Sequence, residues 1–292
     1  MIVAIYGRQF STEFIPHIQK MIKGIEKIAS SFIVYHKFYD FLCSGIEFSK
    51  PVNKFFNHND LDKSAFCLIS IGGDGTLLDT LTIVRDSGIP VLGINTGRLG
   101  FLSAVSADDI SYATENIVSG NYRIDPRSIL HARKPDSLFD EFAFALNELT
   151  VLKRDTTSMI TIKASVNDQF LNTYWADGLI VATPTGSTGY SLSCGGPILT
   201  PESQNFVITP IASHNLTVRP LIIPDNAIVK ISVEGRSQNY LLVLDSRSHE
   251  LTQRVEIELC KAPYSFNLLH PGDNNFYQTI RNKLTWGLDK RN

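Results

Sequence analysis

The chain has 292 residues, of which 43% are hydrophobic and 19% are charged, values typical of a globular protein with a substantial core. The formal net charge of −2 argues against a nucleic-acid partner held by bulk electrostatics, and no apolar stretch approaches the roughly 20 residues that span a membrane. The four cysteines are far apart and match no zinc spacing. We therefore expect a cytoplasmic protein of enzyme size, without structural disulfides, metal-ligating side chains, membrane contact or nucleic acid.

Strands and helices alternate up to about residue 122. The expected strands are Ile2–Tyr6, Phe66–Ile71 and Pro90–Ile94, and the expected helices are Thr12–Ser30, Leu77–Asp86 and Asp108–Val118, the last closed by Gly120. The run Lys50–Asp62 is interpreted as a solvated segment. Such alternation predicts βαβ units and a mostly parallel sheet, which binds ligands at the carboxyl ends of its strands.

A glycine-rich turn, Gly72-Gly73-Asp74-Gly75-Thr76, lies between one of these strands and the helix that follows. Its glycines let an anion approach the backbone N–H groups, and the helix N-terminus favours phosphate. The carboxylate of Asp74 would repel such an anion unless it binds a metal, accepts a proton or holds a hydroxyl that is about to be phosphorylated. A helix N-cap is the alternative role for Asp74.

A second turn, Asn95–Leu102, follows the next strand and is expected beside the first turn. Its Arg98 is interpreted either as a phosphate contact or as part of an ordinary surface turn.

Beyond residue 123 helices nearly vanish. Short alternating runs predict an antiparallel β domain, and they cover residues 128–133, 141–152, 159–166, 178–182, 207–212, 227–233, 240–244 and 255–259. The amphipathic tail Asn274–Trp286 predicts a closing helix. The expected fold is an α/β N-terminal domain with a mostly parallel sheet, residues 1–122, followed by an all-β antiparallel C-terminal domain, residues 123–273, and a closing helix, residues 274–286, that joins the first domain.

A loop rich in hydroxyls and glycines, Thr183–Pro197, follows the expected strand Gly178–Ala182. Hydroxyls and open N–H groups suit a ribose, a base edge or a pyrophosphate, although an ordinary polar loop has a similar composition. The pair Asn147-Glu148 interrupts an apolar run. Asn147 can read a base edge with its donor and acceptor, or both side chains can satisfy backbone groups at the end of a sheet.

Together these motifs closely resemble those of the NAD kinases, a family that phosphorylates the 2′-hydroxyl of the adenosine ribose of NAD to give NADP. The resemblance runs through most of the chain. It is carried, in order, by Gly72–Thr76, Asn95–Leu102, Asn147-Glu148, Asp177-Gly178, Thr183–Pro197 and Phe276–Trp286. Diacylglycerol- and sphingolipid-type kinases share the first motif, and phosphofructokinases carry a near variant. The Thr183–Pro197 loop is far more specific.

The resemblance implies a phosphotransferase that uses ATP or another donor, with Mg²⁺ or another divalent cation on the donor. It implies that Asp74 is the general base that contacts the ribose hydroxyl. The substrate-binding residues it implies are Gly72, Gly73, Gly75 and Thr76 at the phosphates and Asn147, Glu148, Asp177, Thr185, Thr188, Gly189, Tyr190 and Ser193 at the dinucleotide, with Asn147 at the adenine end. Asp177 matches a position near the nicotinamide end that a neighbouring subunit can reach. Because family members form dimers or tetramers, the resemblance also implies a homo-oligomer.

Four positions depart from the family pattern: Trp175 replaces a basic residue, Gly189 an alanine, Ser213 a proline and Ser246 the glycine of an Asp-Gly turn. We expect some backbone strain at Asp245-Ser246 and an effect of these changes on substrate preference rather than on the reaction. Two rival functions differ in class. A lipid kinase would share the first turn but lack the Thr183–Pro197 loop, whereas a non-catalytic dinucleotide sensor would keep the loop without needing Asp74.

Overall fold

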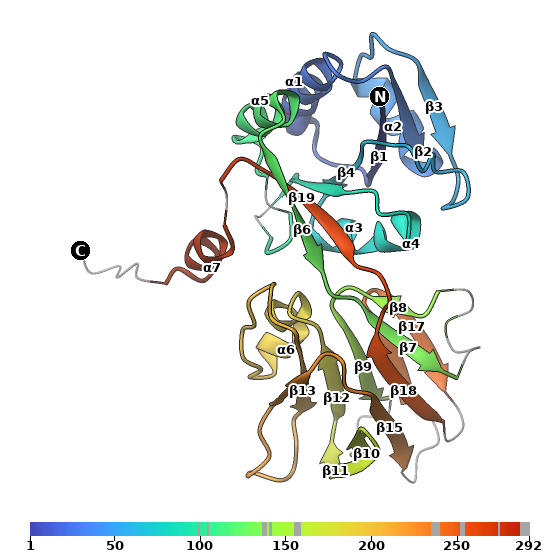
Figure 1. Ribbon diagram of the computed structural model, residues 1–292, viewed down its shortest axis with the longest axis vertical. Coiled ribbons are helices and arrows are strands. Elements are labelled where there is room, and N and C mark those ends of the chain that lie inside the picture. Colours follow the sequence, from blue (N-terminus) through green and yellow to red (C-terminus); the bar gives the residue numbers. More distant parts are fainter. Residues whose placement is uncertain are drawn as a thin grey trace. The chain divides into compact units, whose positions relative to one another are not determined.

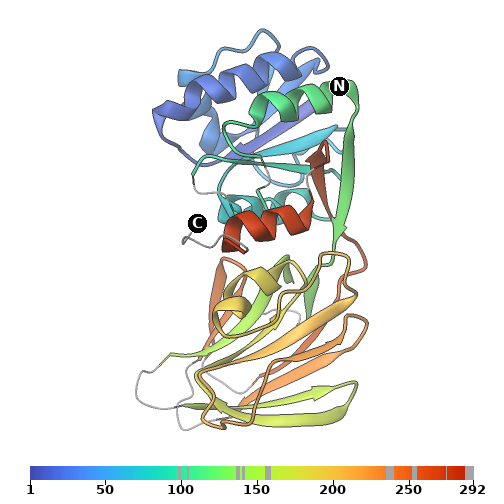
Figure 2. The same ribbon diagram turned by 90° about the vertical axis from the view of Figure 1, so that its left-hand side faces the viewer.

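The computed structural model describes residues 1–97, 100–103, 105–135, 139, 142–154, 159–234, 240–251, 255–273 and 275–286 (Figure 1, Figure 2). Arg98, Leu99 and Asn274, which belong to motifs discussed above, lie outside the described residues. The chain forms two compact units, one of residues 1–126 and 266–292 and the other of residues 127–265. Among the described residues, no helix is long and apolar enough to cross a membrane.

The first unit is built on a seven-stranded sheet with the strand order β3-β2-β1-β4-β5-β19-β6. Its strands are β1 (Ile2–Gly7), β2 (Ser31–Tyr35), β3 (Val52–Phe55), β4 (Cys67–Gly72), β5 (Val91–Asn95), β6 (Tyr122–Arg127) and β19 (Phe266–Pro271). From β3 to β19 the neighbouring strands run parallel. The central strands β4 and β5 are buried along their whole length, which explains their continuous apolar sequences.

The helices of this unit are η1 (Thr12–Phe14), α1 (Ile15–Ile25), α2 (His36–Gly45), α3 (Asp74–Asp79), α4 (Leu81–Val84), α5 (Ile110–Ser119) and α7 (Phe276–Leu284). Buried residues of α1, α2 and α5 share one apolar cluster with alternate residues of the central strands, and Figure 1 shows α1 beside α5. On the opposite face, Leu77 of α3 packs so closely on Gly93 of β5 that a Cβ there would lie 2.6 Å from its Cδ1.

Some expected elements of the first unit were wrong. The helix expected over Leu77–Asp86 is two short helices that begin at Asp74, and they are separated at Thr80, whose hydroxyl donates to the carbonyl of Leu77 at 2.6 Å. The supposedly solvated run Lys50–Asp62 contains β3, where Phe55 is buried. The sequence analysis also missed α2, which begins at His36 directly after β2 with no glycine or proline between them.

The second unit consists of two six-stranded antiparallel sheets, ordered β11-β10-β15-β18-β7-β8 and β14-β13-β12-β9-β16-β17. The strands are β7 (Leu130–Lys134), β8 (Phe144–Ala145), β9 (Glu148–Lys153), β10 (Ile160–Val166), β11 (Gln169–Ala176), β12 (Gly178–Ala182), β13 (Asn205–Ile211), β14 (Leu221–Pro224), β15 (Val229–Glu234), β16 (Tyr240–Leu244), β17 (Arg247–Leu251) and β18 (Glu256–Lys261). Alternate residues from both sheets form one apolar core, so this unit is a β-sandwich. The turns η2 (Gly186–Thr188) and α6 (Tyr190–Ser193) follow β12.

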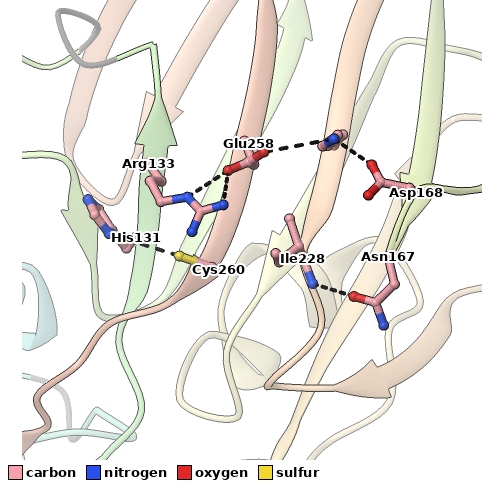
Figure 3. A network of polar contacts seen from close by, with 8 residues as sticks. His131, Arg133, Asn167, Asp168, Ile228, Glu258 and Cys260 are labelled. Atoms are coloured by element: carbon pink, nitrogen blue, oxygen red, sulfur yellow. Dashed lines mark hydrogen bonds and ion pairs between the residues drawn. The ribbon is translucent and has the colours of Figure 1, made fainter.

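A polar network covers part of the outer face of the first of these sheets (Figure 3). Glu258 accepts hydrogen bonds from Arg133 and lies 3.9 Å from Lys230, which also pairs with Asp168. Asn167 and Asp168 form the β10–β11 turn, and both have positive φ, 50° and 62°. Figure 3 shows the Asp168 side chain directed toward the outer-face network.

The two units differ from the expected domains at one strand in particular. Phe266–Pro271, expected within the β domain of residues 123–273, is β19 of the first sheet, where Leu268 pairs with Val91 of β5. An isolated apolar strand carries no local sign of the sheet that it joins, because that choice depends on pairing with residues far away in the sequence. The mostly parallel α/β unit, the antiparallel unit and the final helix α7 are as predicted.

Candidate active site

The first glycine turn connects β4 to α3 in the first unit. Gly72 has φ of 154°, and a Cβ there would lie 2.4 Å from the hydroxyl oxygen of Thr76, so this position requires glycine. Nothing lies within 4 Å of the corresponding Cβ positions of Gly73 and Gly75. These two glycines therefore leave the backbone at the start of α3 open to a ligand, as a phosphate-binding turn needs.

Asp74 is held by the second turn. Its Oδ2 accepts from the amide of Phe101 at 2.8 Å, and its Oδ1 accepts from the amides of Leu102 at 3.2 Å and Ser103 at 3.0 Å. The two turns thus lie side by side, as predicted. The N-cap of α3 is Gly73 and has no side-chain cap, so the alternative role of Asp74 as an N-cap is wrong.

This arrangement leaves Asp74 with a specific capacity. An ionised carboxylate offers about four acceptor positions, and three of them are taken by the amides. About one position is left, which suits a single hydroxyl donor. The side chain is only half-buried, so a ligand can reach it.

Asn147 and Glu148 lie at the start of β9 in the second unit, opposite the end of β12, where Glu148 pairs with Ala182. Two of their side-chain atoms, Asn147 Oδ1 and Glu148 Oε2, are buried and accept no hydrogen bond from the described part of the chain. Such buried acceptors are costly unless a ligand supplies donors. Burial, followed by the neighbouring Asp245, raises the pKa of Glu148 to about 8.

The Thr183–Pro197 loop packs directly on Asn147. A Cβ on Gly186 would lie 2.2 Å from the carbonyl oxygen of Asn147, and a Cβ on Gly189 would lie 3.3 Å from both Asn147 Nδ2 and Glu148 Oε2. The hydroxyl of Thr183 donates to the carbonyl of Leu146 at 2.6 Å, and its amide donates to the carbonyl of Asn147 at 2.9 Å. The loop and the polar pair therefore form one structure.

Several hydroxyls of this loop are used internally. Ser187 donates to the carbonyl of Pro184 and accepts from the amide of Leu199, and Ser191 shares a 2.8 Å hydrogen bond with Thr209. These side chains are buried and hold the loop in place. Composition could not separate them from hydroxyls that face a ligand, because both kinds are serines and threonines in one loop.

The other loop residues predicted to bind the dinucleotide differ from one another in burial and in hydrogen bonding. Thr185 is buried and accepts from Arg127 at 3.4 Å, and the hydroxyl of Thr188 donates to the carbonyl of Thr185. Tyr190 and Ser193 are exposed. Burial raises the pKa of the Tyr190 phenol, with smaller contributions from Cys194 and Asp177.

Asp177 lies apart from Asn147 and Glu148. It precedes the first residue of β12, and the strand separates it by about 16 Å from the end where Ala182 pairs with Glu148. Its carboxylate pairs with Lys153 at 2.6 Å, and its negative charge contributes to the raised pKa of the Tyr190 phenol. The second unit therefore has polar groups at both ends of β12.

The sequence analysis did not place Asp245 in the site. Its carboxylate accepts from three successive amides, those of Leu146, Asn147 and Glu148. The expected strain is located on Asp245, with φ of 52°, and Ser246 is not among the residues with positive φ. The only feature of the sequence that could have pointed to Asp245 is its place directly after the expected strand 240–244.

The described residues contain no cluster of three or more side chains arranged to bind a metal. A surface cavity of about 380 Å³ lies between α1 and α5, and its lining includes Lys20, Lys23 and Lys27. None of the predicted site residues lines this cavity.

Two family models match the chain. Residues 33–122 match the family described as the ATP-NAD kinase N-terminal domain, and residues 146–271 match the ATP-NAD kinase C-terminal domain. The chain is 43% identical over 293 residues to an NAD kinase of Cytophaga hutchinsonii and 45% identical over 294 residues to one of Flavobacterium psychrophilum. Each match covers 100% of both proteins.

Solved structures show the same fold. Yeast NADH kinase complexed with NADH matches with a TM-score of 0.87, covering 100% of this chain and 89% of that one. An NAD kinase from Archaeoglobus fulgidus in complex with ATP matches with a TM-score of 0.72, covering 98% and 99%. Each of the two is 22% identical to this chain. From the full-length sequence matches, the chain belongs to the NAD kinase family, and its activity is the phosphorylation of NAD to NADP.

Proposed function

We propose that ATP carrying Mg²⁺ is the phosphoryl donor and that Asp74 orients and deprotonates the 2′-hydroxyl of the adenosine ribose of NAD. The single observation that carries this proposal is the engagement of the Asp74 carboxylate by three amides, which leaves it about one acceptor position. The open backbone at Gly73 and Gly75 supports a role of this turn in phosphate binding. The ATP found with the Archaeoglobus enzyme supports ATP as the donor.

The chemistry follows from the acidity of the acceptor. A ribose hydroxyl has too high a pKa to ionise before it reacts, so its proton leaves late, as the new bond from oxygen to the γ-phosphorus forms. The bond from that phosphorus to the β,γ-bridging oxygen breaks, ADP departs, and the proton passes to Asp74. The amides that fix Asp74 keep its free oxygen position aimed at the hydroxyl before the reaction begins.

The residues around the turn fit a cation that arrives with the donor. Mg²⁺ usually keeps several waters and binds through one or two carboxylates plus substrate phosphates, so a cage of protein ligands is not needed. When bound, the cation would neutralise charge on the donor phosphates. Gly72, Gly73, Gly75 and Thr76 would line the phosphate side.

We assign dinucleotide binding to the second unit. Asn147 is proposed for the adenine end, because its buried Oδ1 lacks a donor within the described chain. Thr185, Thr188, Gly189, Tyr190 and Ser193 are proposed to contact the adenine, riboses and pyrophosphate together with Glu148. Asp177, at the other end of β12, is proposed for the nicotinamide end.

A homodimer or homotetramer in the cytoplasm is the proposed state of the enzyme. Trp175 and Leu216 are 57% and 86% exposed, and a second subunit that covered them would bury apolar surface, which supports an oligomer. The four cysteines are not paired with one another in the structure. Light scattering coupled to gel filtration would test the oligomer, and a monomer at micromolar concentration would contradict it.

The reaction is tested by incubating the purified protein with NAD and ATP and detecting NADP with an NADP-specific dehydrogenase. We expect product that requires Mg²⁺, and we expect Asp74→Asn to lower kcat by at least about 1000-fold while NAD affinity stays within about tenfold. An Asp74→Asn enzyme with most of its kcat would exclude the assigned role. Replacing ATP with polyphosphate tests the donor, and faster turnover with polyphosphate would overturn the assignment of ATP as the phosphoryl donor.

A further inference from the structure

Asp245 occupies an unusual position for an aspartate in a hairpin turn. It lies between β16 and β17, where its φ of 52° is tolerated by aspartate better than by most residues. Its side chain turns toward β9 instead of solvent. Oδ2 accepts from the amide of Leu146 at 2.8 Å, and Oδ1 accepts from the amides of Asn147 at 2.9 Å and Glu148 at 3.2 Å.

A second charged residue of the same hairpin holds the preceding segment. The guanidinium of Arg247 donates to the carbonyls of Phe142 and Phe144, which lie just before Leu146 in the chain. Arg247 of the hairpin thus binds carbonyl groups of the segment that precedes β9, and Asp245 binds the amide groups at the start of β9. Hydrogen bonds with one charged partner are stronger than neutral ones, so this stretch of backbone is firmly fixed.

The β10–β11 turn shows that this arrangement is not a general property of such hairpins. There Asp168 also has a positive φ, but its carboxylate is 79% exposed and pairs with Lys230 on the outer face (Figure 3). In that turn it is the neighbouring Asn167 whose side chain accepts a hydrogen bond from a backbone amide, that of Ile228 at 2.9 Å. The inward carboxylate of Asp245 is therefore specific to the segment that bears Asn147 and Glu148.

Asp245 and Glu148 also face one another across paired strands. The amide of Asp245 donates to the carbonyl of Glu148 at 3.1 Å, and the amide of Glu148 donates to Asp245 Oδ1. The negative charge of Asp245 opposes the ionisation of Glu148. The other charge that acts on Asp245 is Arg247, and the loop residues packed against Glu148 and Asn147, Gly186 and Gly189, carry none.

We propose that Asp245 is a positioning residue for NAD: it fixes the amides of residues 146–148 and so holds the unpartnered polar atoms of Asn147 and Glu148 in place for the dinucleotide. This inference rests on the proposed assignment of Asn147 and Glu148 to NAD. The pKa values fit an ionised Asp245 beside a neutral Glu148. Burial raises the pKa of Asp245 to about 6, and burial together with the charge of Asp245 raises the pKa of Glu148 to about 8. Glu148 then enters the complex protonated at neutral pH and donates a hydrogen bond.

The first test is Asp245→Asn, with Asp168→Asn as the matched control in the other hairpin. The carboxamide that replaces the carboxylate retains one oxygen for the three amides, so the Asn147-Glu148 segment loses its fixed position. We expect the KM for NAD to rise by about tenfold or more, while kcat and the KM for ATP stay within about threefold. Asp168→Asn is expected to leave all three values unchanged. Thermal melting verifies that each variant is folded.

The second test separates positioning by charge from simple structural support. NAD affinity is measured by calorimetry between pH 6 and pH 9 without ATP. The wild-type affinity should change near pH 8, where Glu148 ionises. This transition should move to lower pH in Asp245→Asn, because the neighbouring negative charge has been removed, and it should vanish in Glu148→Gln. A purely structural role of Asp245 would not move the transition.

The outcomes are distinct. If a folded Asp245→Asn enzyme keeps both the KM for NAD and the position of the pH transition, the inference is wrong even though the wild type still forms NADP. If Asp245→Asn does not fold, Asp245→Ser decides, because its hydroxyl can still accept from an amide but carries no charge: a transition that moves to lower pH with a raised KM for NAD supports the inference, and an unmoved transition with an unchanged KM overturns it. If Asn147→Ala binds NAD as tightly as wild type, the assignment of this segment to the dinucleotide has failed instead.

Discussion

Gly100 and Asp74 approach so closely that no side chain fits between them. A Cβ on Gly100 would lie 1.9 Å from Asp74 Oδ1 and 2.4 Å from Oδ2. The Asp74 carboxylate thus lies against Gly100, and the backbone amides of the three residues after Gly100 donate hydrogen bonds to it. Gly100 of the second turn is therefore needed for the position of Asp74, the proposed base, in the first.

Gly100→Ala should therefore displace Asp74 or the amides that hold it. Because a displacement of about 1 Å at a reacting group can cost about 100-fold in rate, we expect kcat to fall by about that factor. Gly97→Ala is the control in the same turn, because its Cβ would meet only Asn95 Oδ1, at 3.8 Å. Steady-state assays of the two variants give the answer, and equal rates would show that Asp74 does not depend on this contact.

Two glycines of the Thr183–Pro197 loop should respond differently to alanine. A Cβ on Gly186 would lie 2.2 Å from the backbone of Asn147, which cannot move aside without displacing β9, so Gly186→Ala should abolish NAD binding or prevent folding. The nearest atom to a Cβ on Gly189 is the carbonyl oxygen of Gly186 at 3.2 Å, and φ of −93° with ψ of −131° lies outside the main regions that alanine adopts. Gly189→Ala should therefore lower the melting temperature modestly while the KM for NAD stays within about threefold. Calorimetric NAD titration and melting curves measure both effects.

Glu148 should make stability depend on pH. Its pKa is about 8 in the folded protein against an ordinary value of 4.5, so the folded state holds more protons than the unfolded state between these values. The stabilisation from the neutral carboxyl is fully present below the unfolded pKa and is lost as the pH rises through the folded one. The melting temperature without ligand should fall between pH 6.5 and pH 8.5, and Glu148→Gln should flatten this decline. Parallel curves for the two proteins would contradict the raised pKa.

The loop hydroxyls should divide into two classes. Ser191 is buried and bonded to Thr209, so Ser191→Ala should lower the free energy of unfolding by about 1–3 kcal/mol, because Thr209 loses its partner. Ser193 is exposed, and Ser193→Ala should leave stability unchanged while weakening NAD binding. Urea unfolding and NAD titration of the two variants distinguish these roles, and a stability loss in Ser193→Ala would refute the division.

Local patterns were sufficient to predict much of the fold. Continuous apolar runs predicted β4 and β5, and alternation predicted β12 and β16 with the bounds that the structure shows. The glycine turn and the hydroxyl-rich loop were recognisable because their unusual compositions are local. The two turns were also expected side by side, since β4 and β5 end at the same edge of a parallel sheet.

What could not be predicted depends on contacts between distant residues. The amides that bind Asp74 lie 27 to 29 residues away, and those that bind Asp245 lie 97 to 99 residues away. No composition signal links such partners. The same reason explains why Ser191 could not be separated from Ser193, since the difference is the presence of Thr209 beneath one of them.

The place of β19 in its sheet has a consequence for how the protein is made. β19 lies between β5 and β6, yet it is synthesised after the whole of residues 127–265. On a ribosome the first sheet must wait roughly ten to thirty seconds for this strand, and during that time the edges of β5 and β6 lack their partner. A fragment ending at residue 126 should therefore aggregate, whereas residues 127–265, a continuous segment with its own core, should remain expressible alone.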